Sequence, residues 1–195
     1  MIEINNLHKG FKEVKVLKGI NTTFEPGKTN LIIGQSGSGK TVFLKSLIGL
    51  HTPEKGSIIF DGRVNTEMSS DDRRQLRQEI GMVFQGSALF DSQTVEENVM
   101  FPLKMFTKQS DKEMLERANT VLKRVDLVGS NKKFTAELSG GMQKRVGIAR
   151  AIVLDPKYLF ADEPNSGLDP KTAITIDALL SEITDEKKIT TIILT

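Results

Sequence analysis

A glycine-rich segment carries the clearest chemical pattern in the sequence. Residues 34–41 read Gly-Gln-Ser-Gly-Ser-Gly-Lys-Thr and match G-x-x-x-x-G-K-[ST] at every fixed position, between an apolar run and a helix-like segment. Glycines let the backbone turn its N–H groups toward one point, where they form an anion site with the helix start. The pattern predicts a nucleoside triphosphate site rather than a turn with a solvated lysine. The candidate phosphate-binding residues are Gly34, Gln35, Ser36, Gly37, Ser38, Gly39, Lys40 and Thr41.

The last two residues of this segment add charge and a metal ligand. Lys40 supplies a mobile positive charge for the β- and γ-phosphates, and the Thr41 hydroxyl can ligate Mg²⁺. The guanine-specific pattern N-K-x-D is not found, because residues 131–134 read Asn-Lys-Lys-Phe and lack the aspartate. This weakens the interpretation as a GTPase.

Two carboxylates follow an apolar run late in the chain. Asp162 and Glu163 come directly after Tyr158–Ala161, and in open α/β sheets the carboxyl ends of strands face the crevice that binds ligands. Successive side chains along a strand point to opposite faces, so the two carboxylates are expected to point in different directions and to have different roles. We assign Asp162 to Mg²⁺ and Glu163 to polarising a water for in-line attack on the γ-phosphate. Alone, the pair would be read as a helix cap or as solvated residues; beside the glycine-rich loop it predicts catalysis.

A third motif lies before the helix-like segment 143–154. Residues 138–142 read Leu-Ser-Gly-Gly-Met. Ser139 can cap the helix, and Gly140 and Gly141 allow the backbone to approach a phosphate closely. A capped helix start with a flexible loop is the alternative. The motif lies 23 residues before Asp162.

The elements that position these motifs alternate between strands and helices. Three short strands are expected at the start, around Ile2–Leu7, Val14–Leu17 and Ile20–Phe24, and they look antiparallel. Further strands are expected at 29–33, 57–60, 80–84, 158–161 and 190–195, separated by helices, which is the pattern of a parallel α/β sheet. Ser110 with Glu113 forms a capping box for one helix. Asp169 before a proline caps another.

Composition excludes several classes of site. The 195 residues have a net charge of +2, no cysteine and two histidines, His8 and His51, to which we assign no role. Disulfides, cysteine-ligated zinc and thiol catalysis are therefore excluded, as is a site of several imidazoles. The charge balance argues against a nucleic-acid coat. No apolar run approaches the roughly 18 residues of a membrane span, so a membrane role would be peripheral and through a partner.

Taken in order, the motifs resemble those of the nucleotide-binding subunits of ABC transporters, and the resemblance covers the whole chain. It implies that Phe11 stacks on adenine, that Gln85 contributes to catalysis and to Mg²⁺ binding, and that Asp169 of the segment 166–169, Ser-Gly-Leu-Asp, lies at the nucleotide. Phe11 could instead be a core or turn aromatic, and Gln85 could only bond backbone at a strand end.

The resemblance also implies a fold and partners. We expect an α/β P-loop NTPase with a mixed core sheet, an antiparallel N-terminal part and an inserted helical subdomain. Residues 1–195 would be one domain, with a RecA-like core over about 1–85 and 156–195 and the helical subdomain over about 86–155. Ser139, Gly140 and Gly141 of a second ATPase subunit, in a homodimer, would close over ATP and Mg²⁺. An integral-membrane permease would hold the dimer at the cytoplasmic face of the inner membrane.

Two local features resemble the ATPase of Mla/MCE-type systems, which move phospholipids or other hydrophobic substrates. These are Met142 in the third motif and the segment 86–99. Amino-acid importers share much of this segment, so import of another small solute stays an alternative, as do a non-transport ABC ATPase and a nucleotide-binding switch. Five apolar residues could form a groove for a permease helix or the core of the helical subdomain. They are Leu89, Phe90, Val95, Val99 and Phe101.

In this family the strand at 190–195 leads into a switch histidine that contacts the γ-phosphate. Neither His8 nor His51 can align there. We therefore expect the C-terminal end of the domain to be missing, and the chain as given to bind ATP but to hydrolyse it poorly or not at all.

Overall fold

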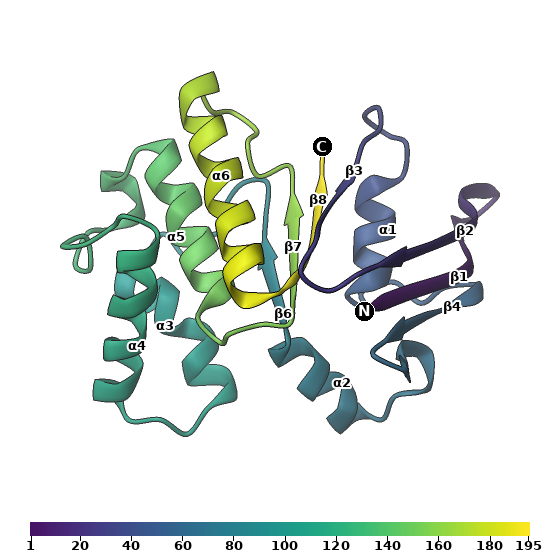
Figure 1. Ribbon diagram of the computed structural model, residues 1–195, viewed down its shortest axis with the longest axis horizontal. Helices are drawn as coiled ribbons and strands as arrows, with labels where there is room; N and C mark the ends of the chain where they lie inside the picture. Colours follow the sequence, from purple (N-terminus) through teal and green to yellow (C-terminus); the bar gives the residue numbers. More distant parts are fainter.

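A computed structural model describes residues 1–195. The strands form two four-stranded sheets (Figure 1). One sheet has the order β2-β1-β4-β5 and is antiparallel: β1 Ile2–Phe11, β2 Val14–Phe24, β4 Lys55–Phe60 and β5 Arg63–Val64. The other has the order β3-β8-β7-β6 and is parallel: β3 Thr29–Ile32, β8 Thr190–Leu194, β7 Tyr158–Asp162 and β6 Ile80–Val83. The expected mixture of strand directions is thus divided between two sheets.

Six α-helices and two short 3-10 turns connect the strands. The helices are α1 Lys40–Leu47, α2 Ser70–Gln78, α3 Val95–Phe106, α4 Asp111–Arg124, α5 Gly140–Ile152 and α6 Pro170–Lys187; the turns are Asn65–Glu67 and Thr135–Glu137. In Figure 1, α3, α4 and α5 gather on one side of the parallel sheet and the antiparallel sheet lies on the other. None of the helices has the length and apolar character needed to cross a membrane.

The N-terminal part differs from the expected three short strands. The second and third are one strand, β2, which pairs with β1 along its length. Gly19 has a left-handed backbone (φ +83°), and the register of the β1–β2 pair shifts around Leu7. Because such a bulge interrupts the period-2 alternation of side chains, one long strand resembles two short ones in the sequence.

The predicted helix caps are confirmed. The Ser110 hydroxyl accepts a hydrogen bond from the Glu113 amide (3.4 Å), and the Glu113 carboxylate accepts one from the Ser110 amide (2.7 Å), at the start of α4. Asp169 accepts from the Thr172 amide (3.1 Å) at the start of α6. These caps fix where each helix begins.

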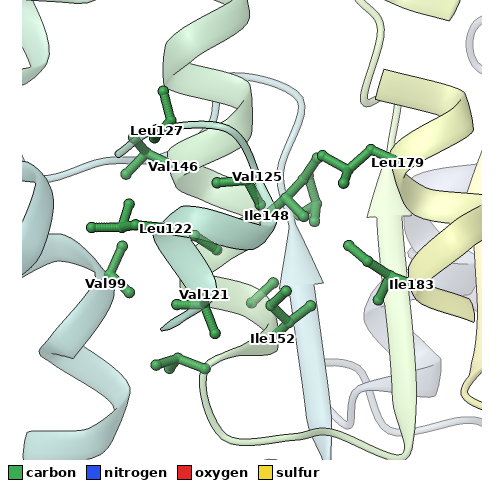
Figure 2. Close-up of a cluster of buried hydrophobic side chains, with 14 of the residues drawn as sticks. Val99, Val121, Leu122, Val125, Leu127, Val146, Ile148, Ile152, Leu179 and Ile183 are labelled. Carbon is green, nitrogen blue, oxygen red and sulfur yellow. The ribbon is translucent and has the colours of Figure 1, made fainter. Parts of the chain in front are cut away.

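Each face of the parallel sheet packs into a different core, because side chains alternate along its strands. Tyr158 and Phe160 face α1 and the antiparallel sheet. Leu159 and Ala161 face the helices α3 to α6, in a cluster of 26 buried residues. Figure 2 shows part of this larger cluster, where side chains of α4, α5 and α6 meet. The ends of β6, β7 and β8 are therefore held from both sides, whereas the edge strand β3 packs through Ile32 on one side only.

Candidate nucleotide-binding site

The glycine-rich loop joins β3 to α1. Gly37 and Gly39 both have left-handed backbones, with φ of +78° and +100°. A Cβ on Gly39 would lie 2.7 Å from Val16 Cγ1 of β2, so no larger residue fits there. The loop closes on itself through the Ser38 amide, which donates to the Gln35 carbonyl (3.1 Å). Glycine is thus required both by backbone conformation and by contact with β2.

The start of α1 offers free donors to an anion. The amides of Gly39, Lys40 and Thr41 donate to no protein acceptor. The Lys40 ammonium group donates to the carbonyls of Gly34 and Gln35, so its charge lies directly over the loop. Unpaired amides at a helix N-terminus beside a lysine are the donors that a phosphate group needs. The loop therefore fits the expected phosphate.

Gln85 and Glu163 come together although they are 78 residues apart in the sequence. Gln85 Nε2 donates to Glu163 Oε2 (2.9 Å) and to Ser166 Oγ (3.2 Å). Glu163 follows β7 with a left-handed backbone (φ +45°), and its amide donates to the Leu194 carbonyl of β8 (2.9 Å). An unfavourable backbone conformation held by neighbouring strands is typical of functional sites.

The glycine-rich loop and the carboxylate face one cleft of about 750 Å³. Gly34, Ser36 and Lys40 line it from one side, and Glu163 and Ser166 line it from the other. A polar cleft of this size can accommodate the phosphates of a nucleotide. The structure thus brings the first two sequence motifs to one site.

Asp162 ends β7 next to this cleft. Burial raises the pKa of its carboxyl group and the charge of Glu163 adds to the rise, whereas Lys40 and Lys45 oppose it. No three His, Cys, Asp or Glu residues cluster to hold a metal ion by themselves. Mg²⁺ usually keeps several waters and is bound by one or two carboxylates together with phosphate oxygens. The Asp162 carboxylate, with the oxygen-bearing side chains of Thr41 and Gln85, suits that mode.

The third motif lines a different hollow. Ser139, Gly140, Gly141 and Asp169 surround a space of about 570 Å³ that shares no lining residue with the cleft at Glu163. The Ser139 hydroxyl caps α5 by accepting from the Met142 amide (3.3 Å). The structure therefore does not bring these residues to the phosphate loop of their own chain.

Within that hollow, a packing contact that the sequence did not show explains why position 141 is a glycine. A Cβ on Gly141 would lie 2.7 Å from Thr172 Cγ2 of α6, whereas one on Gly140 would lie 3.7 Å from the nearest atom, Leu168 Cδ2. The sequence suggested that both glycines admit a phosphate. Gly141 also admits the neighbouring helix α6 of the same chain.

Phe11 lies at the end of β1, and 43% of the residue is exposed. This excludes the alternative that it belongs to the core. Its ring packs edge-on against His51, with ring centroids 5.2 Å apart, and the Lys9 ammonium group lies 5.2 Å from its centroid. An exposed aromatic ring beside a cation can stack on a base. His51, to which the sequence assigned no role, therefore lies against the predicted adenine-stacking ring.

Two cations of α5 were also missed. The Lys144 side chain is buried and donates to the Gln85 carbonyl, while Arg150 donates to the carbonyls of Ser87 and Ala88 (2.7 Å each). Burial lowers the pKa of Lys144, and the charge of Glu163 opposes that shift. Basic side chains on a helix are usually solvated, so no sequence pattern indicated that these two face inward.

The five apolar residues after Gln85 divide between two environments. Val95 and Val99 are fully buried in the larger core, and Leu89 packs against it. Phe90 and Phe101 instead line an apolar groove of about 350 Å³, with their ring centroids 4.8 Å apart. The groove is completed by Met82 of β6, Phe84 directly after it, Phe106 of α3 and Arg150 of α5. The core alternative therefore holds for Val95, Val99 and Leu89, whereas Phe90 and Phe101 line a groove whose occupant stays a prediction.

Comparison with known proteins agrees with this geometry. The family model described as ABC transporter matches residues 17–166. The probable ribonucleotide transport ATP-binding protein mkl of Mycobacterium tuberculosis (strain ATCC 25618 / H37Rv) is 42% identical over 194 residues, covering 100% of this chain and 54% of that protein. The methionine import ATP-binding protein MetN 1 of Pseudomonas savastanoi pv. phaseolicola is 41% identical over 199 residues, covering 100% and 59%. The chain spans about half the length of these curated relatives.

Solved structures extend the comparison to the fold. The dimeric structure of MJ0796, described as a bacterial ABC transporter cassette, matches with a TM-score of 0.90 and 33% identity, over 100% of this chain and 88% of that one. A second dimeric structure of the same cassette, in a post-hydrolysis state, is bound to ADP and Pi. The match of the family model over most of the chain, the identity to relatives and the shared fold lead to one conclusion: this chain belongs to the ABC transporter family, as an ATP-binding domain.

Proposed function

We propose that this chain is the ATP-hydrolysing subunit of a bacterial membrane transporter. The observation that carries the proposal is the hydrogen bond between Gln85 Nε2 and Glu163 Oε2 (2.9 Å), at the cleft that the glycine-rich loop also lines. A carboxylate beside a phosphate site, held by an amide side chain, is placed to act on a water at the γ-phosphate.

Each predicted site residue then has a role in binding or hydrolysing ATP. Phe11 stacks on adenine, and the amides of 39–41 with Lys40 bind the phosphates. Glu163 polarises the water that attacks the γ-phosphorus, and Gln85 orients the carboxylate. Thr41, Gln85 and Asp162 would hold Mg²⁺, which when bound neutralises phosphate charge.

We propose further that the chain works as a homodimer with two composite sites. The hollow formed by Ser139, Gly140, Gly141 and Asp169 is separate from the cleft of its own chain, so it is available to the nucleotide of a second copy. The MJ0796 cassette, which shares the fold, is dimeric. ATP binding would close the dimer and hydrolysis would reopen it.

The apolar groove around Phe84, Phe90 and Phe101 is the proposed docking site for an integral-membrane permease. Phe84 and Phe90 are 41% and 39% exposed and line one groove with Phe101 and Phe106. Contiguous apolar surface of this kind marks interaction sites. Docking there would place the chain peripherally at the cytoplasmic face of the inner membrane. The groove itself lies where the proposed RecA-like core (1–85 and 156–195) meets the proposed helical subdomain (86–155).

For the substrate, we propose phospholipids or other hydrophobic molecules, because Met142 and the segment 86–99 resemble Mla/MCE-type ATPases. Import of a small solute is the second candidate, and the names of the relatives favour it: one is named for ribonucleotide transport and the other for methionine import. Mass spectrometry of the permease and small molecules that copurify with the tagged chain decides between them. Bound lipid supports the first candidate, and bound amino acid or nucleotide with a solute permease contradicts it.

The experiment that tests hydrolysis is Glu163→Gln, measured in single-turnover assays at excess protein, because the chain as given is expected to hydrolyse ATP poorly. This variant should bind ATP as the parent does, lose nearly all hydrolysis in single-turnover assays with radiolabelled ATP, and accumulate as an ATP-bound dimer in light scattering. Glu67→Gln, a change of the same kind at an exposed residue, should behave as the parent. Unchanged single-turnover hydrolysis in Glu163→Gln would sink the assignment of the water-activating residue.

A further inference from the structure

Helix α5 holds the segment that follows β6 by its backbone. The Lys144 ammonium group donates to the Gln85 carbonyl, and the two terminal nitrogens of Arg150 donate to the carbonyls of Ser87 and Ala88 at 2.7 Å each. Three carbonyls within four residues are thus bound by two cations of one helix. We call Lys144 and Arg150 the α5 clamp.

The clamped segment has a backbone that needs such support. Ser87 and Ala88 both adopt left-handed conformations, with φ of +61° and +46°, although neither is glycine. Two consecutive residues in this region persist only where surrounding contacts over-determine them. Gly147 of α5 also lies close to this segment, since a Cβ on it would be 3.7 Å from Ser87 Cβ. The clamp and this close approach supply those contacts.

The other end of the segment reaches the carboxylate. Gln85 offers its main-chain carbonyl to Lys144 and uses its side-chain amide to bind Glu163 and Ser166. One residue therefore joins α5, which begins in the third motif, to the residue proposed to activate water. Lys144 is buried, and the Gln85 carbonyl is the acceptor of its hydrogen bond.

We propose that Lys144 is a positioning residue for ATP hydrolysis: through the Gln85 carbonyl it holds the Gln85 side chain against Glu163. The proposal rests on the proposed function, in which Glu163 activates the water. The hydrogen bond of the Lys144 ammonium group goes to the Gln85 carbonyl, so Lys144 would act through Gln85. Its loss should therefore slow the chemical step and leave nucleotide binding intact, because Phe11, Lys40 and the free amides of the loop do not depend on it.

The test compares Lys144→Met, which keeps the apolar stem and removes the donor, with Lys144→Gln, which keeps an N–H donor without the charge. Lys123→Met, on an exposed side chain of α4, is the matched control. Two quantities are measured with each chain: single-turnover hydrolysis against ATP concentration, and hydrogen exchange of the Ser87 amide, which donates to Phe84.

Lys144→Met should lower the maximal single-turnover rate at least tenfold, with half-saturation by ATP changed less than twofold. Its Ser87 amide should exchange at least tenfold faster without nucleotide. Lys144→Gln should stay within threefold of the parent in rate and in exchange, and Lys123→Met should match the parent. A rate loss without faster exchange, or faster exchange with the parent's rate, overturns the proposal.

The experiments distinguish an error in the positioning role of Lys144 from an error in the proposed function. If Glu163→Gln hydrolyses as fast as the parent, the proposed function is wrong. If Glu163→Gln is inactive while Lys144→Met behaves as the parent, only the positioning role of Lys144 is contradicted. Should Lys144→Met fail to fold, Lys144→Ala replaces it, because it removes the donor and leaves room for water at the Gln85 carbonyl. The same loss of rate and faster Ser87 exchange are expected, and parent-like values overturn the proposal.

Discussion

Replacing Gly141 by alanine tests why a glycine stands at the start of α5. In the structure the new Cβ would lie 2.7 Å from Thr172 Cγ2. Carbon atoms in contact prefer about 3.5–4.0 Å, so roughly 0.8 Å must be gained by moving α5 away from α6 or by turning the Thr172 side chain. Either movement disturbs the hollow that Ser139 and Asp169 line.

The expected cost follows from two opposing effects. Overpacking of this kind costs about 1–3 kcal/mol, while alanine in place of a helical glycine recovers about 0.5–1 kcal/mol. The difference between the central values of these two effects is about 1 kcal/mol. We therefore expect Gly141→Ala to destabilise the chain by about 1 kcal/mol, or roughly 2–4 °C in melting temperature for a chain of this size. Because a displacement near 1 Å at a reacting site can cost about a hundredfold, single-turnover hydrolysis should fall at least tenfold.

A second substitution separates the two reasons for the glycine. Thr172→Ser removes the Cγ2 that the new Cβ at position 141 would meet but keeps the backbone amide that Asp169 caps. If contact with α6 is the cause, Gly141→Ala with Thr172→Ser should regain the melting temperature of Thr172→Ser alone and hydrolyse within threefold of it. If stability returns but hydrolysis does not, the contact with Thr172 explains the loss of stability alone, and the reasoning that links this contact to hydrolysis is refuted.

Two further predictions concern stability. Asn98 is fully buried and bonds four backbone groups of the preceding loop at 2.8–3.3 Å; Asn98→Ala should cost about 2–4 kcal/mol in thermal unfolding because buried groups lose partners, against less than about 0.5 kcal/mol for exposed Asn119→Ala. Hydrogen bonds from the Ser110 hydroxyl and amide lower the pKa of Glu113, so the carboxylate stabilises the fold above its unfolded pKa of about 4.3 and this contribution is lost as pH falls through the lower folded pKa. In urea unfolding the parent and a Glu116→Gln control should therefore lose more stability between pH 7 and pH 3 than Glu113→Gln; parallel profiles would contradict this.

Local sequence patterns predicted the motifs and helix caps, because each depends on residues that are neighbours in the chain. The loop 34–41 and the caps at Ser110 and Asp169 are of this kind. The division of the first strands was predicted wrongly, because the register shift around Leu7 and the turn at Gly19 belong to a pairing between two strands. Whether Phe90 is core or groove was likewise left open, since burial depends on what packs against a residue.

The sequence by itself determined the chemistry of this protein: a phosphate loop, a carboxylate pair and a capped glycine motif, each readable because a short contiguous segment has one main physical use. Tertiary structure alone decided how they meet. It put Gln85 against Glu163, separated Gly141 from that cleft and placed it on Thr172, and turned Lys144 inward onto the Gln85 carbonyl. These contacts join residues tens of positions apart, so they are set by how helices and strands pack rather than by spacing in the chain.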